Sequence, residues 1–362
     1  MMKKVELALG TRSYQIHIGI NNLSRLGPEM RKLGLRGKVL IVTNTKVEPL
    51  YAESLIDTLK ETGFSVHKAV LPDGENYKNL DNVAFIYDCA FNAGLDRQSS
   101  IIALGGGVVG DMAGFAAATY MRGINFIQVP TTLLAQVDAS IGGKVAVNHP
   151  QGKNMIGAFY QPRMVFMDIA TLLTLSSGEI RSGFAEIIKY GVISNHSLYS
   201  YLEEHPFLEN IDNLEYWMDV VEKSCLIKAQ VVSKDEREQG LRAILNFGHT
   251  IGHGLEAATS YQKYSHGEAV AIGMVGAACI AREMGLISSG EEERIKNLIG
   301  KTGLPVSYSD ISWDDLWFYI QRDKKAQDGN INFILPTSIG SVILSPVDSE
   351  LMRKVLEQEL VK

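Results

Sequence analysis

The sequence predicts an α/β N-terminal domain built on a Rossmann-like parallel sheet, followed by a mainly α-helical C-terminal domain. Three observations support this prediction. In the first half, short apolar segments alternate with helix-period segments, which is the pattern of βαβ units. One of these apolar segments, residues 101–104, ends at three consecutive glycines. After residue 177 almost every periodic segment has the period of a helix.

The first half contains seven segments with strand character, which are either apolar throughout or alternate between apolar and polar residues. Two of them lie within residues 5–18, and the others cover residues 38–43, 64–71, 100–104, 125–129 and 164–168. Helices are expected between them at residues 47–61, 81–93 and 112–121. This alternation predicts right-handed crossover connections and a parallel sheet.

The loops after four of these strands are expected to form one crevice, because ligands of parallel sheets bind outside the carboxyl ends of the strands. These loops begin at or contain Asn44, Asp73, Gly105 and Thr131. In the third loop, a glycine turn leads into the N-terminus of a helix. Free N–H groups and the helix dipole both favour an anion there, so the loop is suited to a phosphate.

The glycine loop differs from the standard dinucleotide-binding loop. Gly105, Gly107 and Gly110 match the pattern G-x-G-x-x-G. That pattern also requires an acidic residue about 20 positions later. Residues 130–132 stand there instead, with the sequence Pro-Thr-Thr. We therefore predict a nucleotide-binding phosphate loop of another kind, and the alternative is a glycine turn kept only for tight packing.

The second half is expected to be helical, with one pair of strands. The helical segments cover residues 179–192, 214–233, 243–258, 268–284, 290–300 and 313–322. Residues 332–335 and 341–344 have strand character and can pair across the turn between them. The change of pattern near residues 170–177 divides the chain into expected domains 1–174 and 175–362, with a cleft between them as a common place for a substrate.

Composition restricts the class of protein. The formal net charge of −6 argues against a nucleic-acid or anionic-membrane surface, so an anionic substrate must be held by local basic residues. The three cysteines are far apart and suggest no disulfide framework or metal site. Because no continuous apolar segment is long enough for a signal peptide or a membrane span, we expect a soluble cytoplasmic protein.

Four residues of the second half are candidate metal ligands. His249 and His253 lie four residues apart and share a helix face, His266 begins the next helical segment, and Glu186 is flanked by apolar residues. One glutamate and two histidines with an open position form a catalytic zinc arrangement. The alternative is a set of ordinary hydrogen-bonded histidines and a helix salt bridge from Glu186 to the nearby Lys189. Thr250 stands where H-E-x-x-H would have its glutamate, which excludes that metalloprotease motif.

Basic and amide residues form a second candidate set. Arg122 and Lys144 are bracketed by glycines, and this favours contact with a phosphate or carboxylate. The others are more ordinary and are expected to be solvated unless a ligand recruits them. They are Lys153, Asn154, Lys228, Arg242, Asn246 and the pair Lys324 and Lys325.

Six motifs together resemble the 3-dehydroquinate synthase family of the sugar phosphate cyclase superfamily. They are DGENYK (73–78), GGGVVGD (105–111), VPTTLLAQVDASIGGKVAVNHPQGKNMIGAFYQP (129–162), GFAEIIKYG (183–191), LNFGHTIGH (245–253) and SHGEAVAIGM (265–274). They cover most of the chain in the order of the family, and the long central motif is highly specific.

The resemblance implies a role for each matching residue. The residues implied to contact NAD are Asn44, Asp73, Glu75, Lys78, Gly106, Gly107, Val108, Val109, Gly110, Asp111, Thr131, Thr132, Lys144, Lys153, Thr171, Leu172, Leu173 and Thr174. The implied ligands of one Zn²⁺ or Co²⁺ ion are Glu186, His249 and His266. The residues implied to contact the substrate are Arg122, Asp138, Lys144, Asn154, Lys189, Lys228, Glu238, Arg242, Asn246 and His253, with either Lys324 or Lys325.

The resemblance also implies the reaction. The substrate would be a seven-carbon deoxy keto-acid phosphate, which NAD oxidises transiently so that phosphate can leave by elimination. Reduction of the ketone, ring opening and an internal aldol step would then close a carbocycle. Lys189 and Asp138 would relay a proton, Lys144, Asn154, His253 and Arg122 would hold the phosphate, and Arg242 and Lys228 would meet the carboxylate.

Three other functions remain as alternatives. They are a metal-dependent NAD polyol dehydrogenase of similar architecture, a sugar phosphate cyclase that makes another carbocycle, and a nucleotide-binding regulator without catalysis. The resemblance further suggests a homodimer.

Overall fold

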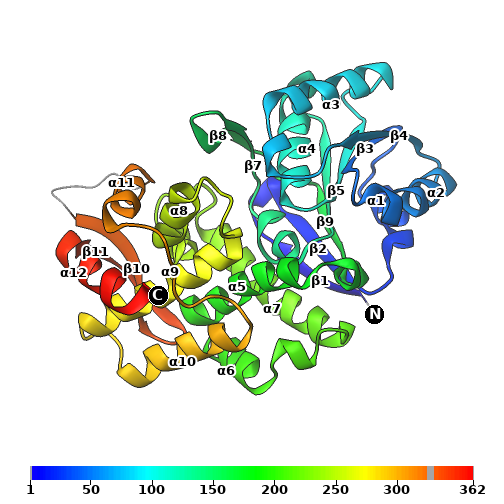
Figure 1. The fold of residues 1–362 in the computed structure, drawn as a ribbon. Helices are drawn as coiled ribbons and strands as arrows, with labels where there is room; N and C mark the ends of the chain where they lie inside the picture. The colour runs from blue at the N-terminus through cyan, green and yellow to red at the C-terminus, as the bar shows by residue number, and fades with distance from the viewer. Residues whose placement is uncertain (1, 324–329, 362) are drawn as a thin grey trace. The chain divides into compact units, whose positions relative to one another are not determined.

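The fold is that of a computed structural model of the chain, which describes residues 2–323 and 330–361. The chain forms two compact units (Figure 1). The first contains Met1–Leu175 and Leu214–Arg237, and the second contains Ser176–Asn213 and Glu238–Lys362. Each unit buries large apolar side chains of its own, such as Phe166 in the first unit and Phe184 in the second.

A seven-stranded sheet forms the centre of the first unit, with the strand order β1-β2-β9-β6-β5-β3-β4. Only β1 and β2 pair antiparallel, and every other neighbouring pair in this sheet is parallel. All seven expected strands are confirmed. Their bounds are β1 Met2–Leu7, β2 Tyr14–Gly19, β3 Lys38–Asn44, β4 Ser65–Leu71, β5 Ser100–Gly105, β6 Asn125–Pro130 and β9 Met164–Asp168.

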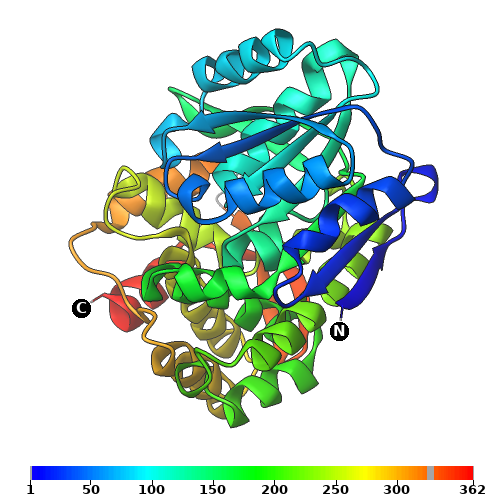
Figure 2. The same ribbon diagram turned by 90° about the vertical axis from the view of Figure 1, so that its right-hand side faces the viewer.

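Helices cover both faces of this sheet (Figures 1 and 2). Leu40 and Val42 of β3 belong to the core cluster that contains residues of α3 (Leu80–Asn92) and α4 (Gly107–Thr119). Val39 and Ile41 belong to the opposite cluster, with residues of α1 (Leu26–Lys32) and α2 (Glu53–Glu61). Each fully buried side chain of this size contributes about 1.5–3 kcal/mol, which explains why the strand is apolar along its whole length.

A hairpin that the sequence did not predict lies within the long central motif. Strands β7 (Lys144–His149) and β8 (Gly152–Phe159) pair antiparallel as a separate two-stranded sheet. Val145 and Val147 join the core cluster of α3 and α4. Their spacing of two residues and the turn at Pro150 were the signals available in the sequence.

The second unit is mainly helical, as expected. Its helices are α5 Ser177–Ser194, α6 His196–Glu204, α8 His249–Ala258, α9 His266–Glu283, α10 Ser289–Lys301, α11 Trp313–Asp323 and α12 Ser349–Val355. The expected strand pair is confirmed as β10 (Asn330–Ser338) and β11 (Ser341–Asp348), which run antiparallel. Helices α6 and α12 were not predicted from the sequence. Among the described residues, no helix is long and apolar enough to cross a membrane.

The expected helix over residues 243–258 is wrong at its start. A 3₁₀ helix covers Leu241–Asn246, and α8 begins only at His249. Gly248 breaks the helix because its φ of +79° is left-handed. A Cβ atom at Gly248 would also lie 2.8 Å from the carbonyl oxygen of Val270, so α8 and α9 require glycine where they approach each other.

Gly273→Ala should destabilise the second unit strongly, because a Cβ atom at Gly273 of α9 would lie 1.9 Å from the carbonyl oxygen of Gly248. We expect a loss of about 3 kcal/mol or more in the free energy of unfolding. Gly290→Ala is the matched control, since the nearest atom to its added Cβ would lie 3.9 Å away. Denaturant unfolding of both variants tests this. Equal stability of the two variants would contradict the close approach.

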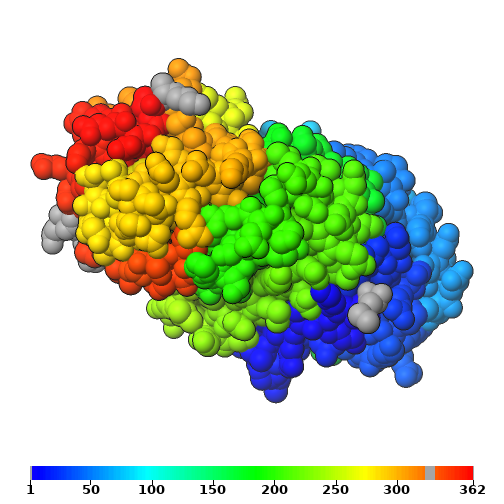
Figure 3. Space-filling view, turned by 90° about the horizontal axis from the view of Figure 1, so that it is seen from below, coloured from blue at the N-terminus to red at the C-terminus, as the bar shows by residue number. Residues whose placement is uncertain are grey.

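Helix α7 (Leu214–Lys234) belongs to the first unit, which differs from the predicted division into residues 1–174 and 175–362. Lys3 of β1 pairs with Asp219 and Glu222 at 2.5 and 2.7 Å. Figure 3 shows yellow-green residues of this segment beside the dark blue N-terminal residues. The helical period of α7 shows which face is buried, but it carries no information about the partner that covers this face.

Candidate active site

The glycine loop joins β5 to α4 without any left-handed residue among its first three glycines. Helix α4 begins at Gly107, before the expected range 112–121, and Gly106 is its N-cap. The glycines provide room instead of unusual φ angles. A Cβ atom at Gly105 would lie 2.8 Å from Val109, and one at Gly110 would lie 2.8 Å from Gln128. The result is a helix N-terminus whose first turn is suited to an anion.

The other strand ends are fixed by side chains predicted to contact the cofactor. Asn44 donates from Nδ2 to Asp73 Oδ1 at 2.6 Å, and this links the ends of β3 and β4. The backbone N–H of Thr131 donates to the carbonyl of Gly105 at 3.0 Å. Three of the predicted cofactor residues, Asn44, Asp73 and Thr131, therefore take part in hydrogen bonds between neighbouring strand ends.

Lys78 connects two further predicted residues, Asp111 and Asn154. Its Nζ lies 2.5 Å from Asp111 Oδ2 in α4 and donates to Asn154 Oδ1 in β8 at 2.5 Å. Glu75 accepts a hydrogen bond from Asn148 of β7 at 2.8 Å. Burial raises the pKa of Asp111 to about 6, although the Lys78 ammonium opposes this shift. The hairpin that the sequence analysis missed thus holds Asn154 beside the glycine-loop helix.

The other predicted residues of the first unit lie in a 3₁₀ helix, on the β7–β8 hairpin and after α4. Thr171 and Thr174 lie in a 3₁₀ helix, where Thr174 shares a 2.6 Å hydrogen bond with Tyr51. Lys144 and Lys153 lie on the β7–β8 hairpin. Arg122 is exposed and follows α4 with a left-handed φ of 67°.

A buried ion pair links α7 to a short helix after β6. Lys228 Nζ donates to Asp138 Oδ1 at 2.6 Å and to the Asp138 carbonyl at 2.7 Å, and only 5% of Lys228 is exposed. Both residues were predicted to contact the substrate. The pair explains why α7 belongs with the first unit, because a buried ammonium requires an ionised partner.

In the second unit, three helices bring the predicted metal ligands together. Glu186 lies within α5 and is fully buried, while His249 and His266 are the first residues of α8 and α9. The Nε2 atoms of both histidines lie 3.6 Å from Glu186 Oε1. One ligand atom from each of the three residues lies within 4.8 Å of the others.

The electrostatic surroundings fit a divalent metal. Burial and the neighbouring Lys189 ammonium lower the pKa of His249 to about 3, so this ring is neutral, as a ligand must be. Its Nδ1 faces the Phe247 carbonyl at 3.1 Å, which leaves Nε2 toward Glu186. Burial alone would lower the pKa of His266, but Glu186 and Glu256 outweigh it and raise the pKa to about 10, so a metal ion would displace a proton from this ring on binding. A carboxylate and two imidazole nitrogens are a donor set for Zn²⁺ or Co²⁺.

Other predicted residues surround this cluster. Lys189 forms an ion pair with Glu186, one turn earlier on α5. The ring of His253 lies 5.3 Å from that of His249, as the spacing of four residues predicted. Asn246 donates to Glu238 at 2.8 Å, and Arg242 is buried. Lys324 and Lys325 lie outside the described residues.

Glu256, a buried carboxylate next to the cluster, was not predicted from the sequence. Its Oε2 atom lies 3.4 Å from His266 Nδ1, and it forms a second group of possible metal ligands with His253 and His266. The available signal was the spacing of three residues from His253, which places both side chains on one face of α8.

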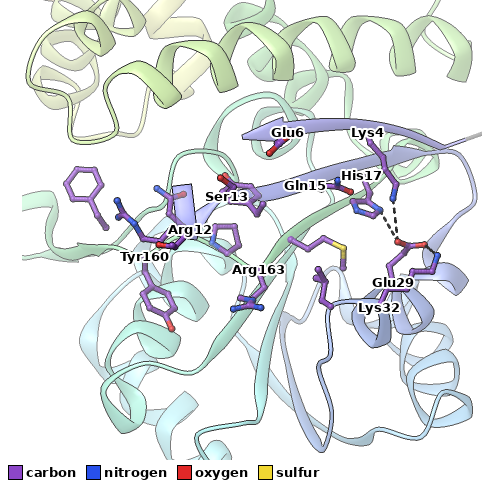
Figure 4. Close-up of a pocket in the computed structure, with 17 residues that line it drawn as sticks. Lys4, Glu6, Arg12, Ser13, Gln15, His17, Glu29, Lys32, Tyr160 and Arg163 are labelled. Carbon is purple, nitrogen blue, oxygen red and sulfur yellow. Dashed lines mark hydrogen bonds and ion pairs between the residues drawn. The ribbon is translucent and has the colours of Figure 1, made fainter. Parts of the chain in front are cut away.

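A pocket of about 620 Å³ lies elsewhere in the first unit and contains none of the predicted site residues (Figure 4). Glu29 is one of its two carboxylates and lies with its oxygens 2.5 Å from Lys32 Nζ and 3.8 Å from Lys4 Nζ. His17 Nδ1 also lies 3.8 Å from Glu29. Burial, with a contribution from Lys4, lowers the pKa of His17 to about 4.

His17 is expected to make the protein sensitive to acid. The neutral ring is stable in the folded chain, whereas the unfolded chain binds a proton near pH 6.5. Above pH 6.5, His17 is neutral in both states and has no cost for folding. As the pH falls from 6.5 toward 4, the free energy of unfolding decreases, by about 2 kcal/mol at pH 5, because only the unfolded chain gains the proton. His17→Gln should flatten the dependence of the free energy of unfolding on pH in this window. The exposed His67→Gln should leave it unchanged, and an equal effect of both variants would contradict the assignment.

Comparison with known proteins places the chain in a family. Residues 68–182 match the family model described as 3-dehydroquinate synthase N-terminal, and residues 183–326 match the one described as 3-dehydroquinate synthase C-terminal. A 3-dehydroquinate synthase from Crocosphaera subtropica is 50% identical over 362 residues, which are 99% of each chain.

Two solved structures have the same fold. A 2-deoxy-scyllo-inosose synthase complexed with carbaglucose-6-phosphate, NAD⁺ and Co²⁺ matches with a TM-score of 0.90 and 27% identity, over 98% of this chain and 100% of the other. A 2-epi-5-epi-valiolone synthase from Streptomyces hygroscopicus with NAD⁺ and Zn²⁺ bound matches with a TM-score of 0.88 and 27% identity, over 97% of each chain. Because two models of one family match successive parts of the chain and a relative is 50% identical over nearly its full length, the chain belongs to the 3-dehydroquinate synthase family.

Proposed function

We propose that this chain converts 3-deoxy-D-arabino-heptulosonate 7-phosphate to 3-dehydroquinate and phosphate. The observation that carries the proposal is the 50% identity to the Crocosphaera enzyme across 99% of both chains. The group of Glu186, His249 and His266 supports it, because the reaction requires an oxygen to be polarised while a hydride leaves its carbon. The enzyme is then a lyase of the shikimate pathway that leads to aromatic amino acids.

The cofactor assignment is NAD, bound by the loops at the strand ends of the first unit. NAD supplies a hydride acceptor that also returns the hydride. The first turn of α4, including Gly107 and Val108, would bind its diphosphate through N–H groups. Asn44 and Asp73 are already linked by a 2.6 Å hydrogen bond and would orient the adenosine ribose. The two similar cyclase structures contain NAD⁺, which supports this assignment.

The metal assignment is one Zn²⁺ or Co²⁺ ion per chain, bound by Glu186, His249 and His266. A metal ion there supplies a Lewis acid. Lys189 would hold the proton of the reacting hydroxyl on Nζ, because its ion pair with Glu186 keeps this nitrogen at the cluster. Asp138 would take part in the same proton transfer through its carboxylate.

The anion-binding residues define the substrate class. Lys144, Asn154, His253 and Arg122 would bind the phosphate, and Arg242 and Lys228 would bind the carboxylate. Arg242 and Lys228 are buried cations, 3% and 5% exposed, and Lys228 already pairs with Asp138 at 2.6 Å, so a substrate carboxylate at Lys228 would join this ion pair. Glu238 and Asn246, which share a hydrogen bond, would position the ring hydroxyls.

A direct assay tests the proposal. Purified protein with NAD⁺ and Zn²⁺ should release phosphate from the heptulosonate phosphate and form 3-dehydroquinate, identified by mass and NMR spectroscopy. Glucose 6-phosphate, which lacks the carboxylate, is tested in a separate assay as an alternative substrate. We expect no carbocycle from it. Turnover of glucose 6-phosphate in place of the heptulosonate would instead indicate a different sugar phosphate cyclase.

The proposal includes a cytoplasmic homodimer in which Arg122 serves the site of the neighbouring chain. The exposure of Arg122 after α4 supports this arrangement. Arg122→Ala and Lys144→Ala should each inactivate the enzyme when purified alone. Mixed dimers of the two variants should regain activity, because one of their two sites then has both residues. No gain on mixing, with heterodimers demonstrated by mass spectrometry, would contradict a shared site.

A further inference from the structure

A second carboxylate faces the metal-ligand cluster of the second unit. Glu256 lies near the end of α8, two turns after His249, and only 5% of it is exposed. Its Oε2 atom lies 3.4 Å from His266 Nδ1. The opposite nitrogen of that ring, Nε2, lies 3.6 Å from Glu186 Oε1. The imidazole of His266 is therefore held between two carboxylates.

Close packing of α8 against α9 allows this contact. A Cβ atom at Gly252 would lie 3.1 Å from the backbone of Ala269, so the two helices approach closely between the Glu256 turn and the Gly248 turn. His266 is the first residue of α9, and its position depends on that packing. The backbone N–H of Tyr261 also donates to the Glu256 carbonyl at 2.7 Å, which fixes the end of α8.

The contact determines which nitrogen of His266 can bind a metal. An imidazole that donates its Nδ1 proton to a carboxylate presents the Nε2 lone pair as its ligand atom, and the carboxylate makes that nitrogen more basic. His249 has an equivalent arrangement, because its Nδ1 faces the Phe247 carbonyl. Both histidines thus have Nδ1 occupied and Nε2 directed to Glu186.

We propose that Glu256 is a positioning residue, which fixes the Nδ1–H form of His266 so that Nε2 coordinates the metal. This inference rests on the metal centre of the proposed function. It separates the roles of the two glutamates, since Glu186 is a ligand and Glu256 acts only through His266. The competing arrangement makes Glu256 itself a ligand, together with His253 and His266. Glu186 is the better ligand because both Nε2 atoms lie at the same distance, 3.6 Å, from one of its oxygens.

The test uses the full chain loaded with Co²⁺ and compares wild type with Glu256→Gln, Glu256→Ala and Glu292→Gln. Glu292 is the matched control, because it is a buried glutamate of the same unit that pairs with Arg282 in place of a histidine. Co²⁺ affinity is measured by competition with a chelator, ligand geometry by the visible absorption of the bound Co²⁺, and folding by thermal unfolding of the metal-free proteins.

We expect Glu256→Ala to weaken Co²⁺ binding by about 10- to 100-fold. Glu256→Gln, which keeps an acceptor oxygen without the charge, should recover part of this loss. Both variants should still bind one Co²⁺ per chain at saturation, with an altered visible spectrum, while Glu292→Gln should match wild type.

Wild-type affinity and spectrum in both Glu256 variants would overturn the positioning role, even if their thermal stability fell. Loss of stoichiometric binding in Glu256→Gln would also overturn it, because Glu256 would then be a ligand. If wild type itself bound no Co²⁺ yet formed 3-dehydroquinate, the inference would fail while the proposed reaction stood. The variants could also show the expected effects on Co²⁺ binding while wild type does not convert the heptulosonate phosphate. In that case the proposed reaction would be wrong and the role of Glu256 would stand.

Discussion

Removal of the metal is expected to abolish phosphate release, and addition of Zn²⁺ or Co²⁺ is expected to restore it. The reason is the donor set of Glu186, His249 and His266, whose ligand atoms lie within 4.8 Å of one another. A Lewis acid at a developing oxyanion contributes several kcal/mol, which corresponds to a rate loss of about a thousandfold or more when it is removed. Chelator treatment, metal analysis and an assay of phosphate release measure this.

His249→Ala should give the same loss without unfolding the first unit, since His249 begins α8 of the second unit. We expect metal stoichiometry to fall below one per chain while NAD⁺ still binds. His205→Ala is the control, because that ring is exposed and stacks on Tyr201 in the same unit. Full activity of the metal-stripped wild type would exclude a catalytic metal at this cluster.

The sheet of the first unit was predictable because the residues within each strand carry the signal for that strand. The apolar segments of β3 and β5 are buried on both faces, and such strands have continuous apolar sequences. The glycines at the β5–α4 turn marked a close approach, which the distances from Gly105 and Gly110 to neighbouring side chains explain. The start of α4 was wrong because glycines disfavour a helix interior but are acceptable in its first turn.

The features that the sequence did not reveal depend on distant partners. Helix α7 is amphipathic, but its assignment to the first unit requires the contacts of Lys3 and Asp138. The break before α8 lies at Gly248, whose φ is left-handed and where the Val270 carbonyl of another helix leaves no room for a side chain, so the helical period of residues 243–258 could not show it. These cases share one cause, namely that periodicity reports which residues are buried and not what covers them.

The candidate site was predicted in part for a related reason. Glu186, His249 and His266 could be named from residue type, spacing and the family resemblance. Glu256 was not named, because a glutamate in a helix is usually solvated. Its spacing of three residues from His253 was the one available signal, and only the packing of α8 on α9 brings it to His266. Residue type suggests the groups that bind a metal directly, whereas the groups that orient them depend on the fold.

The largest expected effect after metal removal concerns the stoichiometry of NAD⁺. We expect many molecules of phosphate to be released per molecule of NAD⁺, while the absorbance of reduced nicotinamide stays near its baseline. The motivation is the coexistence in one chain of a helix N-terminus suited to a phosphate, a group of possible metal ligands and several cations proposed to bind the substrate's anionic groups. A simple dehydrogenase uses the first two features but has little need for buried cations such as Arg242 and Lys228.

Isotope labelling makes this prediction sharper. Elimination of phosphate requires a transient ketone beside the C–H bond that breaks, and the product requires that ketone to be reduced again before it leaves. Deuterium on the carbon that is oxidised should therefore be retained in 3-dehydroquinate, because the same hydride returns to it. Lys228→Met should weaken binding of the heptulosonate without causing reduced cofactor to accumulate, since the role proposed for Lys228 is to bind the substrate carboxylate and not to take part in hydride transfer. Accumulation of reduced nicotinamide in step with product would contradict the cyclase reaction and favour a metal-dependent polyol dehydrogenase.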